Sequence, residues 1–159
     1  MSDFAAPWEL SRSRFIAEFS GLRQDQLDWS PASGVLSIGQ MAAHVAGVEA
    51  YFSRQLRDLT LEPGLRRVEM SAVDGVVNDK AFPFEAGELT VDGLLGVFAE
   101  TEALVRPMMD DPASIANKSL VSALGPVIDG RGALTRLAFH PAYHQGQAYL
   151  LKQLPGYPA

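Results

Sequence analysis

The three histidines of this sequence are the residues best suited to chemistry, because two of them have the spacing of a metal-binding pair. His140 and His144 are four residues apart in "FHPAYHQGQ" (139–147) and would lie about 40° apart on one face of a helix. His44 would have to reach them from a second helix. Neutral imidazoles bind divalent zinc, nickel, iron or manganese, and three of them leave a position open for water or substrate. The alternative is that each histidine is a hydrogen-bonded, partly buried helix residue.

The overall composition limits both the ligands and the partners of such a site. The 159 residues include no cysteine, which excludes disulfides, thiolate ligands and a cysteine nucleophile. A formal net charge of −6 and the lack of a basic run argue against nucleic acid or an anionic membrane as the main partner. No Walker loop, G-x-S-x-G or G-x-G-x-x-G motif is present, so the sequence gives no support to a P-loop, serine-hydrolase or dinucleotide-binding function.

The N-terminal residues and the hydropathy pattern favour a cytoplasmic protein. The start "MSDFAAPWELSRSR" is acidic in part and lacks the apolar segment of a signal peptide. No stretch approaches the roughly 18 uninterrupted apolar residues that a membrane-spanning helix needs. The length is that of one ordinary domain, and we expect a single helical domain over residues 1–159.

Four segments show the apolar spacing and end signals of amphipathic helices. Ser37 and Gln40 form a capping box before one of them, and Thr90 is a suitable N-cap for another. The region 61–89 is rich in glycine and proline and is predicted to be a crossover connection, in which 70–82 could form a short helix. No strand alternation is found. The sequence therefore predicts an all-α four-helix bundle with a long crossover between the second and third helices, the helices spanning about 7–23, 37–59, 90–109 and 132–154.

Pro141 lies between the two histidines of the pair and has to be reconciled with a helix. A proline removes one backbone N–H and its ring pushes against the carbonyl of residue 137, so the helix either bends here or restarts with Pro141 in its first turn. A bend keeps both histidines on one face, whereas a restart would leave His140 outside the helix. The apolar spacing on both sides of Pro141 is continuous, which favours the bend.

Several other side chains are candidates for a place beside the metal or the substrate. Gln147 would lie one turn beyond the second histidine and could orient a ligand, or could equally hold a neighbouring helix. Arg136 could bind an anionic group of the substrate, or be solvated at the surface. Tyr51 could reach the pocket, although an aromatic residue at helical spacing usually belongs to the core. Glu18 and Glu49 could hydrogen-bond a histidine, but nothing in the sequence selects them.

Two stretches resemble the DinB-like (YfiT-related) family. "DWSPASGVLSIGQMAAHVAGVEAYF" (28–52) is similar to the family's "W-x-P" segment followed by a capped helix that carries a histidine. "LTRLAFHPAYHQGQAYLLKQLPG" (134–156) resembles its C-terminal "H-x-x-x-H-x-G-Q" helix. Both stretches occur in the family's order, whereas the region 61–89 matches only in being a long crossover. Pro141 is a departure, because members more often have an ordinary helix former there.

The resemblance implies a function as well as a fold. It implies an up-and-down helical bundle that holds a divalent metal on three histidines, here His44, His140 and His144, and that commonly forms a homodimer. It also implies a metal-dependent transferase, isomerase or hydrolase acting on a small molecule, in several members with a low-molecular-weight thiol as cofactor. Many members have no established activity, so a non-catalytic bundle that binds a metal or ligand is the alternative.

Overall fold

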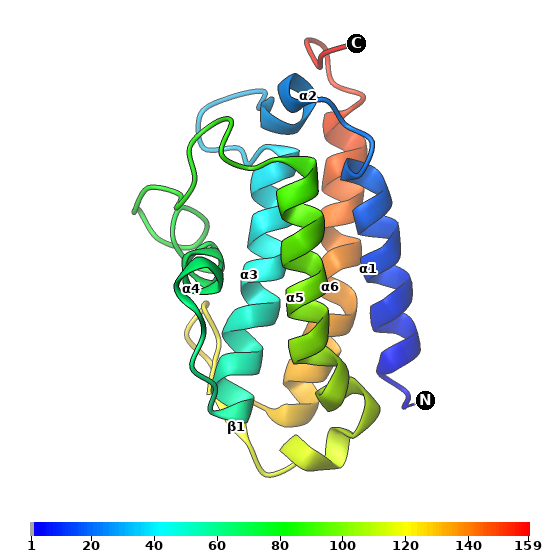
Figure 1. Ribbon diagram of the computed structural model, residues 1–159, viewed down its shortest axis with the longest axis vertical. Helices are drawn as coiled ribbons and strands as arrows, with labels where there is room; N and C mark the ends of the chain where they lie inside the picture. The colour runs from blue at the N-terminus through cyan, green and yellow to red at the C-terminus, as the bar shows by residue number, and fades with distance from the viewer. Residues whose placement is uncertain (1) are drawn as a thin grey trace.

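The computed structural model describes residues 2–159 and shows four long helices packed side by side (Figure 1). Their bounds are Ala5–Phe19 for α1, Ile38–Arg57 for α3, Val91–Asp110 for α5 and Gly130–Leu151 for α6. Shorter elements connect them, namely α2 (Gln24–Asp28), α4 (Pro63–Met70), the 3-10 helix η1 (Pro112–Ile115) and the strands β1 (Ser119–Val121) and β2 (Val127–Asp129). The predicted all-α four-helix bundle is confirmed.

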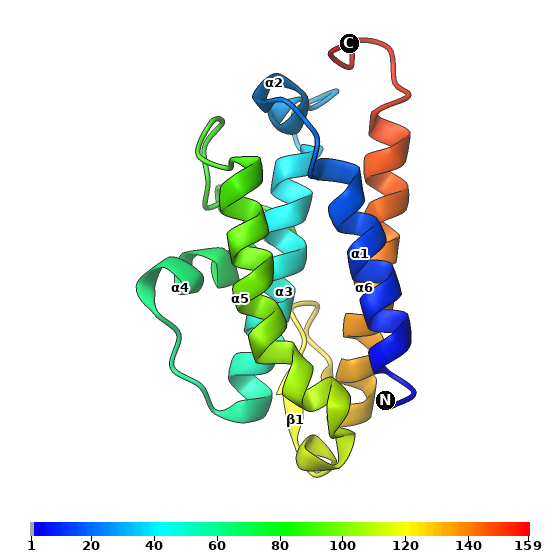
Figure 2. The same cartoon turned by 45° about the vertical axis from the view of Figure 1, so that its right-hand side comes forward.

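The crossover between α3 and α5 determines the direction of the helices. In Figures 1 and 2, α1 and α6 run toward one end of the bundle, whereas α3 and α5 both run toward the other. After α3 the chain therefore returns along the bundle through α4 before α5 begins. Because α3 and α5 are parallel, the bundle is not a simple up-and-down arrangement, and in this respect the expectation taken from the family resemblance was wrong.

The predicted starts of α3 and α5 are confirmed by their capping hydrogen bonds. The Ser37 hydroxyl accepts from the backbone N–H of Gln40, whose side chain in turn accepts from the N–H of Ser37. At the start of α5, the Thr90 hydroxyl accepts from the N–H of Gly93. These caps satisfy backbone groups that would otherwise lack partners in the first turn. They fix where each helix enters the bundle, and thus where His44 lies.

The other predicted helix bounds need correction. The first helix ends at Phe19, and the rest of the predicted segment forms a turn before the separate short helix α2. The last helix begins two residues earlier than predicted, because the Asp129 carboxylate caps it by accepting from the N–H of Gly132 at 2.7 Å. It also ends earlier, at Leu151.

The two irregular connections contain structure that the sequence patterns did not reveal. In the crossover the short helix spans Pro63–Met70, where a proline occupies the first turn, and residues 71–77 form turns instead of the helix predicted over 70–82. Gly75 has a φ of 72°, which only glycine adopts easily. In the connection between α5 and α6, β1 and β2 form an antiparallel hairpin, although no strand was predicted. Three residues are too few for strand alternation to be recognised.

A buried ion pair occupies the middle of the bundle. Arg12 of α1 and Glu49 of α3 are 6% and 1% exposed, and the Arg12 Nε lies 3.1 Å from a Glu49 carboxylate oxygen. The same carboxylate accepts hydrogen bonds from the Trp8 indole and the Thr101 hydroxyl. Three helices are thereby tied to one carboxylate, and apolar packing continues above and below it. The network makes α3 the central helix of the fold.

Helix α6 also carries apolar side chains on its outer face. Phe139, Tyr143 and Leu150 lie within about 40° of one another around the helix and are 51%, 58% and 63% exposed. We call these three residues the outer stripe of α6. A search of residues 2–159 finds no helix with both the length and the apolar composition needed to cross a membrane.

Candidate metal centre

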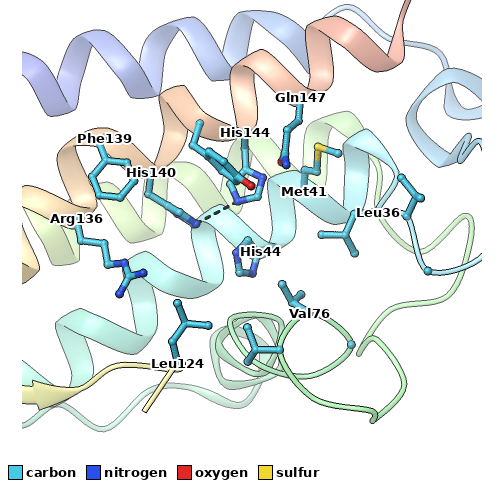
Figure 3. A pocket seen from close by; sticks show the side chains of 15 residues that line it. Leu36, Met41, His44, Val76, Leu124, Arg136, Phe139, His140, His144 and Gln147 are labelled. Atoms are coloured by element: carbon cyan, nitrogen blue, oxygen red, sulfur yellow. Dashed lines mark hydrogen bonds between the residues drawn. The ribbon is translucent and has the colours of Figure 1, made fainter. Parts of the chain in front are cut away.

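Helices α3 and α6 bring the three histidines together, with His44 on α3 and the other two on α6. One nitrogen from each of His44, His140 and His144 lies within 4.8 Å of the other two, and the Nε2 atoms of His140 and His144 are 3.1 Å apart. His44 and His144 are both 5% exposed, and His140 is partly buried. Figure 3 shows the three rings converging from the two helices toward one point. The cluster could hold a metal ion.

A backbone carbonyl orients His44. The Nδ1 of His44 lies 2.8 Å from the carbonyl oxygen of Ser71, and because a carbonyl can only accept, Nδ1 carries the proton. The Nε2 atom is therefore left with its lone pair free. This is the arrangement found around many metal-binding histidines, in which the second nitrogen donates to a carbonyl or carboxylate.

The position of that carbonyl depends on close packing between α3 and the end of α4. The Ser71 hydroxyl lies 2.7 Å from the Ala43 carbonyl of α3, to which it donates. A Cβ atom at Gly47 would lie 2.6 Å from the Val68 carbonyl oxygen and 2.9 Å from the Ala72 nitrogen, so only a glycine permits this approach. The missing side chain at position 47 thus brings the Ser71 carbonyl within reach of His44.

The last helix continues through Pro141 without a break. Helix α6 is unbroken from Gly130 to Leu151, so the interpretation in which a new helix starts at Pro141 was wrong and His140 belongs to the helix. The buried Ser11 hydroxyl of α1 lies 2.6 Å from the Ala138 carbonyl and donates to it, which adds a partner close to the turn that the proline disturbs. The two histidines therefore keep their shared face. A bend at this point remains a prediction.

All three imidazoles are held in the neutral form that binds metals. Burial lowers the pKa of His44, and the bond to the Ser71 carbonyl partly opposes this. Burial also brings the pKa of His140 well below its ordinary value, and the charges of His144, His44 and Arg136 act in the same direction. For His144, burial and the charge of His44 lower the pKa from 6.5 to about 3, against a smaller effect of the Gln147 amide. Neutral imidazoles at physiological pH are ready to ligate.

The donor set fits a divalent ion. Two imidazole nitrogens on one tetrahedral zinc ion are roughly 3.4 Å apart, given bonds of about 2.1 Å, and the pair on α6 is already close to this separation. The Nδ1 of His144 is buried and has no hydrogen-bond partner of acceptable geometry within residues 2–159. Three nitrogen donors without a carboxylate suit zinc, nickel, iron or manganese better than calcium or magnesium, which prefer oxygen.

A cavity of about 590 Å³ opens beside the three histidines. Its walls come from α3 and α6 and from three connections, which contribute Leu36, Val76 and Leu124 among others. Figure 3 shows these apolar side chains facing the rings across the cavity. A volume of this size accommodates a small organic molecule.

Two of the three additional candidates lie at this cavity and the third does not. Gln147 and Arg136 both line it. Tyr51 is absent from its walls and packs against core residues, with its ring 6.3 Å from that of Phe52. It shares the stripe of His44 but lies seven residues further along α3, about 10 Å away along the helix axis.

The acidic residues considered as partners of the histidines bind elsewhere. Glu49 belongs to the buried ion pair on another side of α3. Glu18 accepts from Lys152 and Gln145, which ties α1 to the end of α6. The residue that sequence reasoning missed is Ser71, because it acts through its carbonyl and any residue type supplies one. The visible signal was the small residues Ala43 and Gly47 on α3, which permit another segment to approach closely.

Comparison with known proteins identifies the family of this chain. The family model of the DinB superfamily matches residues 8–148, a range that contains all three histidines and all four long helices in whole or in large part. Neither the curated proteins nor the solved structures include one that matches this chain. The match covers most of the chain, and it agrees with the resemblance carried by the two histidine segments. The chain therefore belongs to the DinB superfamily.

Proposed function

We propose that this protein is a metal-dependent enzyme that acts on a small molecule in the cavity beside His44, His140 and His144. The observation that carries the proposal is the convergence of three neutral imidazole nitrogens at the wall of an apolar cavity. A divalent ion in such a site supplies Lewis-acid chemistry, which polarises a substrate oxygen or lowers the pKa of a water or thiol nearby. The chemistry fits a transferase, isomerase or hydrolase.

The residues of the chain have distinct parts in this proposal. The Ser71 carbonyl holds the His44 ring so that its free lone pair faces the other two histidines. The largely apolar side chains of the walls lower the local dielectric constant, which strengthens electrostatic interactions inside the cavity. Gln147 lies one turn from His144 at the cavity wall, where its amide can hydrogen-bond a substrate or a ligand. These parts position reactants and do not by themselves identify the reaction.

Metal titration tests the proposal directly. Protein purified without a histidine tag and stripped by a chelator is titrated calorimetrically with zinc, nickel, iron(II) and manganese. We expect one ion per chain, and loss of binding in His144→Ala and His140→Ala. Gln147→Ala is the matched control on the same helix and is expected to retain the stoichiometry. Absence of binding for all four metals, or equal binding by the histidine variants, would refute the proposal.

A non-catalytic metal- or ligand-binding bundle is the second candidate. The observation that favours it is the lining of the cavity, in which residues 2–159 contribute no carboxylate that could act as a general base. Thermal unfolding with and without chelator separates the two candidates. A site whose loss unfolds the protein is structural, whereas a site that empties with little change in melting temperature is available for chemistry.

A low-molecular-weight thiol as cofactor is a further part of the proposal, taken from the family. The chain supplies no cysteine of its own, so a thiol nucleophile would have to come from outside. Incubating the metal-loaded protein with a panel of thiols and an electrophilic probe tests this. Turnover that needs both thiol and metal supports it, and turnover independent of the thiol counts against it.

We also infer a homodimer, as members of the family commonly form. The outer stripe of α6 supports the inference, because three large apolar side chains on one helix face are exposed in the monomer. Phe139 and Tyr143 belong both to this stripe and to the cavity wall. A partner bound here would therefore lie next to the cavity.

A further inference from the structure

Arg136 lies where the cavity meets a smaller, apolar chamber. It is one turn before His140 on α6, and both residues line the cavity beside the histidines. Both also line an adjoining chamber of about 100 Å³. Figure 3 shows the guanidinium on the same side of α6 as the His140 ring, close to Leu124. The Arg136 Nη1 donates to the Ser122 hydroxyl at 3.0 Å, which holds the side chain in this place.

The charge of Arg136 is not balanced by a neighbouring carboxylate. Within residues 2–159 its guanidinium forms no ion pair, although the chain carries 19 acidic residues and a net charge of −6. No aspartate or glutamate of the described chain lines either cavity. An arginine beside low-dielectric walls attracts an anion more strongly than one in open water. The cavity is thus a locally positive site in an acidic protein.

The walls of the smaller chamber are suited to a short hydrocarbon group. They include Val48, Phe52, Ala72 and Ala123, and the polar part of the lining is concentrated at Arg136, Ser122 and the histidines. A molecule that places an anionic group on Arg136 can therefore extend an apolar part into this chamber. Its remaining part would face the three imidazoles.

We propose that the substrate of this site is a small amphipathic carboxylate, whose anionic group pairs with Arg136 and whose apolar part occupies the chamber lined by Val48 and Phe52. The inference rests on the proposed function, because it names the class of substrate for that same site. The planar fork of an arginine binds a carboxylate through two parallel hydrogen bonds, which selects it over a neutral amide of the same shape.

The test uses the full chain and simple probes. Binding of hexanoate, of its neutral analogue hexanamide and of acetate is measured by calorimetry or ligand-observed NMR, on chelated and on metal-loaded protein. The variants are Arg136→Gln and Arg136→Lys, with Arg14→Gln as a control that removes an exposed arginine of α1. Melting temperatures and metal titrations of each variant are recorded alongside.

We expect wild-type protein to bind hexanoate at least about tenfold more tightly than hexanamide, equivalent to about 1.4 kcal/mol. The preference should be present in the chelated protein, so that it reports on Arg136 and not on a carboxylate bound to metal. It should fall below about twofold in Arg136→Gln, persist in part in Arg136→Lys, and be unchanged in Arg14→Gln. Acetate, which has no apolar part, should bind more weakly than hexanoate.

The inference would be overturned if chelated wild-type protein showed no preference for hexanoate, or if Arg136→Gln retained the preference. Equal loss in Arg136→Lys and Arg136→Gln would also contradict recognition through charge. The metal titration keeps the two proposals separate. Failure to bind metal with the anion preference intact would refute the proposed function alone, whereas normal metal binding without the preference would refute the substrate class alone.

Discussion

Replacing Gly47 with alanine should weaken both the fold and the metal site, although the change adds one methyl group. The added Cβ would lie 2.6 Å from the Val68 carbonyl oxygen and 2.7 Å from the Ser71 hydroxyl oxygen. Both belong to the end of α4, which would have to move away from α3 by roughly 0.8 Å to reach normal contact distance. The Ser71 carbonyl moves with it, so the 2.8 Å hydrogen bond to His44 lengthens beyond good geometry.

Three contributions set the expected size of the effect. Alanine in place of glycine inside a helix stabilises it by about 1 kcal/mol. Overpacking at a well-packed contact costs about 1–3 kcal/mol, and the loss of a buried hydrogen bond costs about 1 kcal/mol more. The net result for Gly47→Ala is a loss of about 1–3 kcal/mol. Because His44 also loses its orienting partner, affinity for the metal should fall by about 10- to 100-fold.

Gly96→Ala and Gly146→Ala are matched controls for this experiment. Each glycine lies inside a long helix, and a Cβ atom there would meet no atom within 4 Å apart from its own helix and neighbours. Gly96→Ala should raise the free energy of unfolding by up to about 1 kcal/mol. Gly146→Ala changes a residue two positions from His144 and should leave metal affinity unchanged. Urea unfolding gives the stabilities, and calorimetric titration gives the affinities.

The differences in unfolding free energy and in metal affinity between Gly47→Ala and its controls decide the outcome. If Gly47→Ala is as stable as Gly96→Ala, the end of α4 accommodates the added methyl group without the expected overpacking cost. If Gly47→Ala loses stability but binds metal as tightly as the wild type, the Ser71 carbonyl does not orient His44. Either result would refute the reasoning at a separate step.

Three further predictions concern the bundle around the site. Glu49→Ala leaves the buried Arg12 without its main partner and should lower the free energy of unfolding in urea by about 3–5 kcal/mol. The double change Arg12→Met and Glu49→Leu should cost clearly less, because it leaves no unpaired charge. Equal losses would contradict the role of the ion pair. Burial raises the pKa of Glu18, but its bonds with Lys152 and Gln145 outweigh this and hold the pKa below 4.5 in the folded protein. The ionised Glu18 therefore contributes its full stabilisation above pH 4.5, and this contribution is lost as the pH falls through the lowered pKa. Glu18→Gln should flatten the curve of unfolding free energy against pH in this acidic range. An unchanged curve would contradict the stabilising role of Glu18. Leu150→Glu on the outer stripe should shift the protein from dimer to monomer in light scattering, and a wild-type protein that is monomeric at all concentrations would refute the dimer.

The sequence predicts local structure well where the backbone needs a side chain of one particular type. Ser37 and Thr90 fix the starts of α3 and α5 because a hydroxyl at that place satisfies free N–H groups, and this preference can be read without a structure. The spacing of His140 and His144 likewise follows from the geometry of one helix. That His44 should face them was an inference from the family resemblance, since no local pattern links two helices so far apart in sequence.

Other parts depended on tertiary packing and could not be predicted. Arg12 is a charged residue and is therefore expected to be solvated, but it lies on the inner face of α1. Its burial is explained only by the ion pair with Glu49. The helix in the crossover starts at Pro63, and the segment after it turns at Gly75, where Phe82 packs closely. The orienting carbonyl of Ser71 has no side-chain signature at all, because every residue carries one.

The cavity is built from two kinds of structure, and this has a consequence for engineering. The nitrogen donors and Arg136 stand on rigid helices, whereas much of the opposite wall comes from connections, through Leu36, Val76 and Leu124. Connections tolerate exchange of residues far better than the interior of a bundle does. A library restricted to residues 34–36, 76–77 and 123–124 would therefore vary what the cavity accepts while the reactive groups keep their places. Selection from such a library could change the substrate without redesigning the fold.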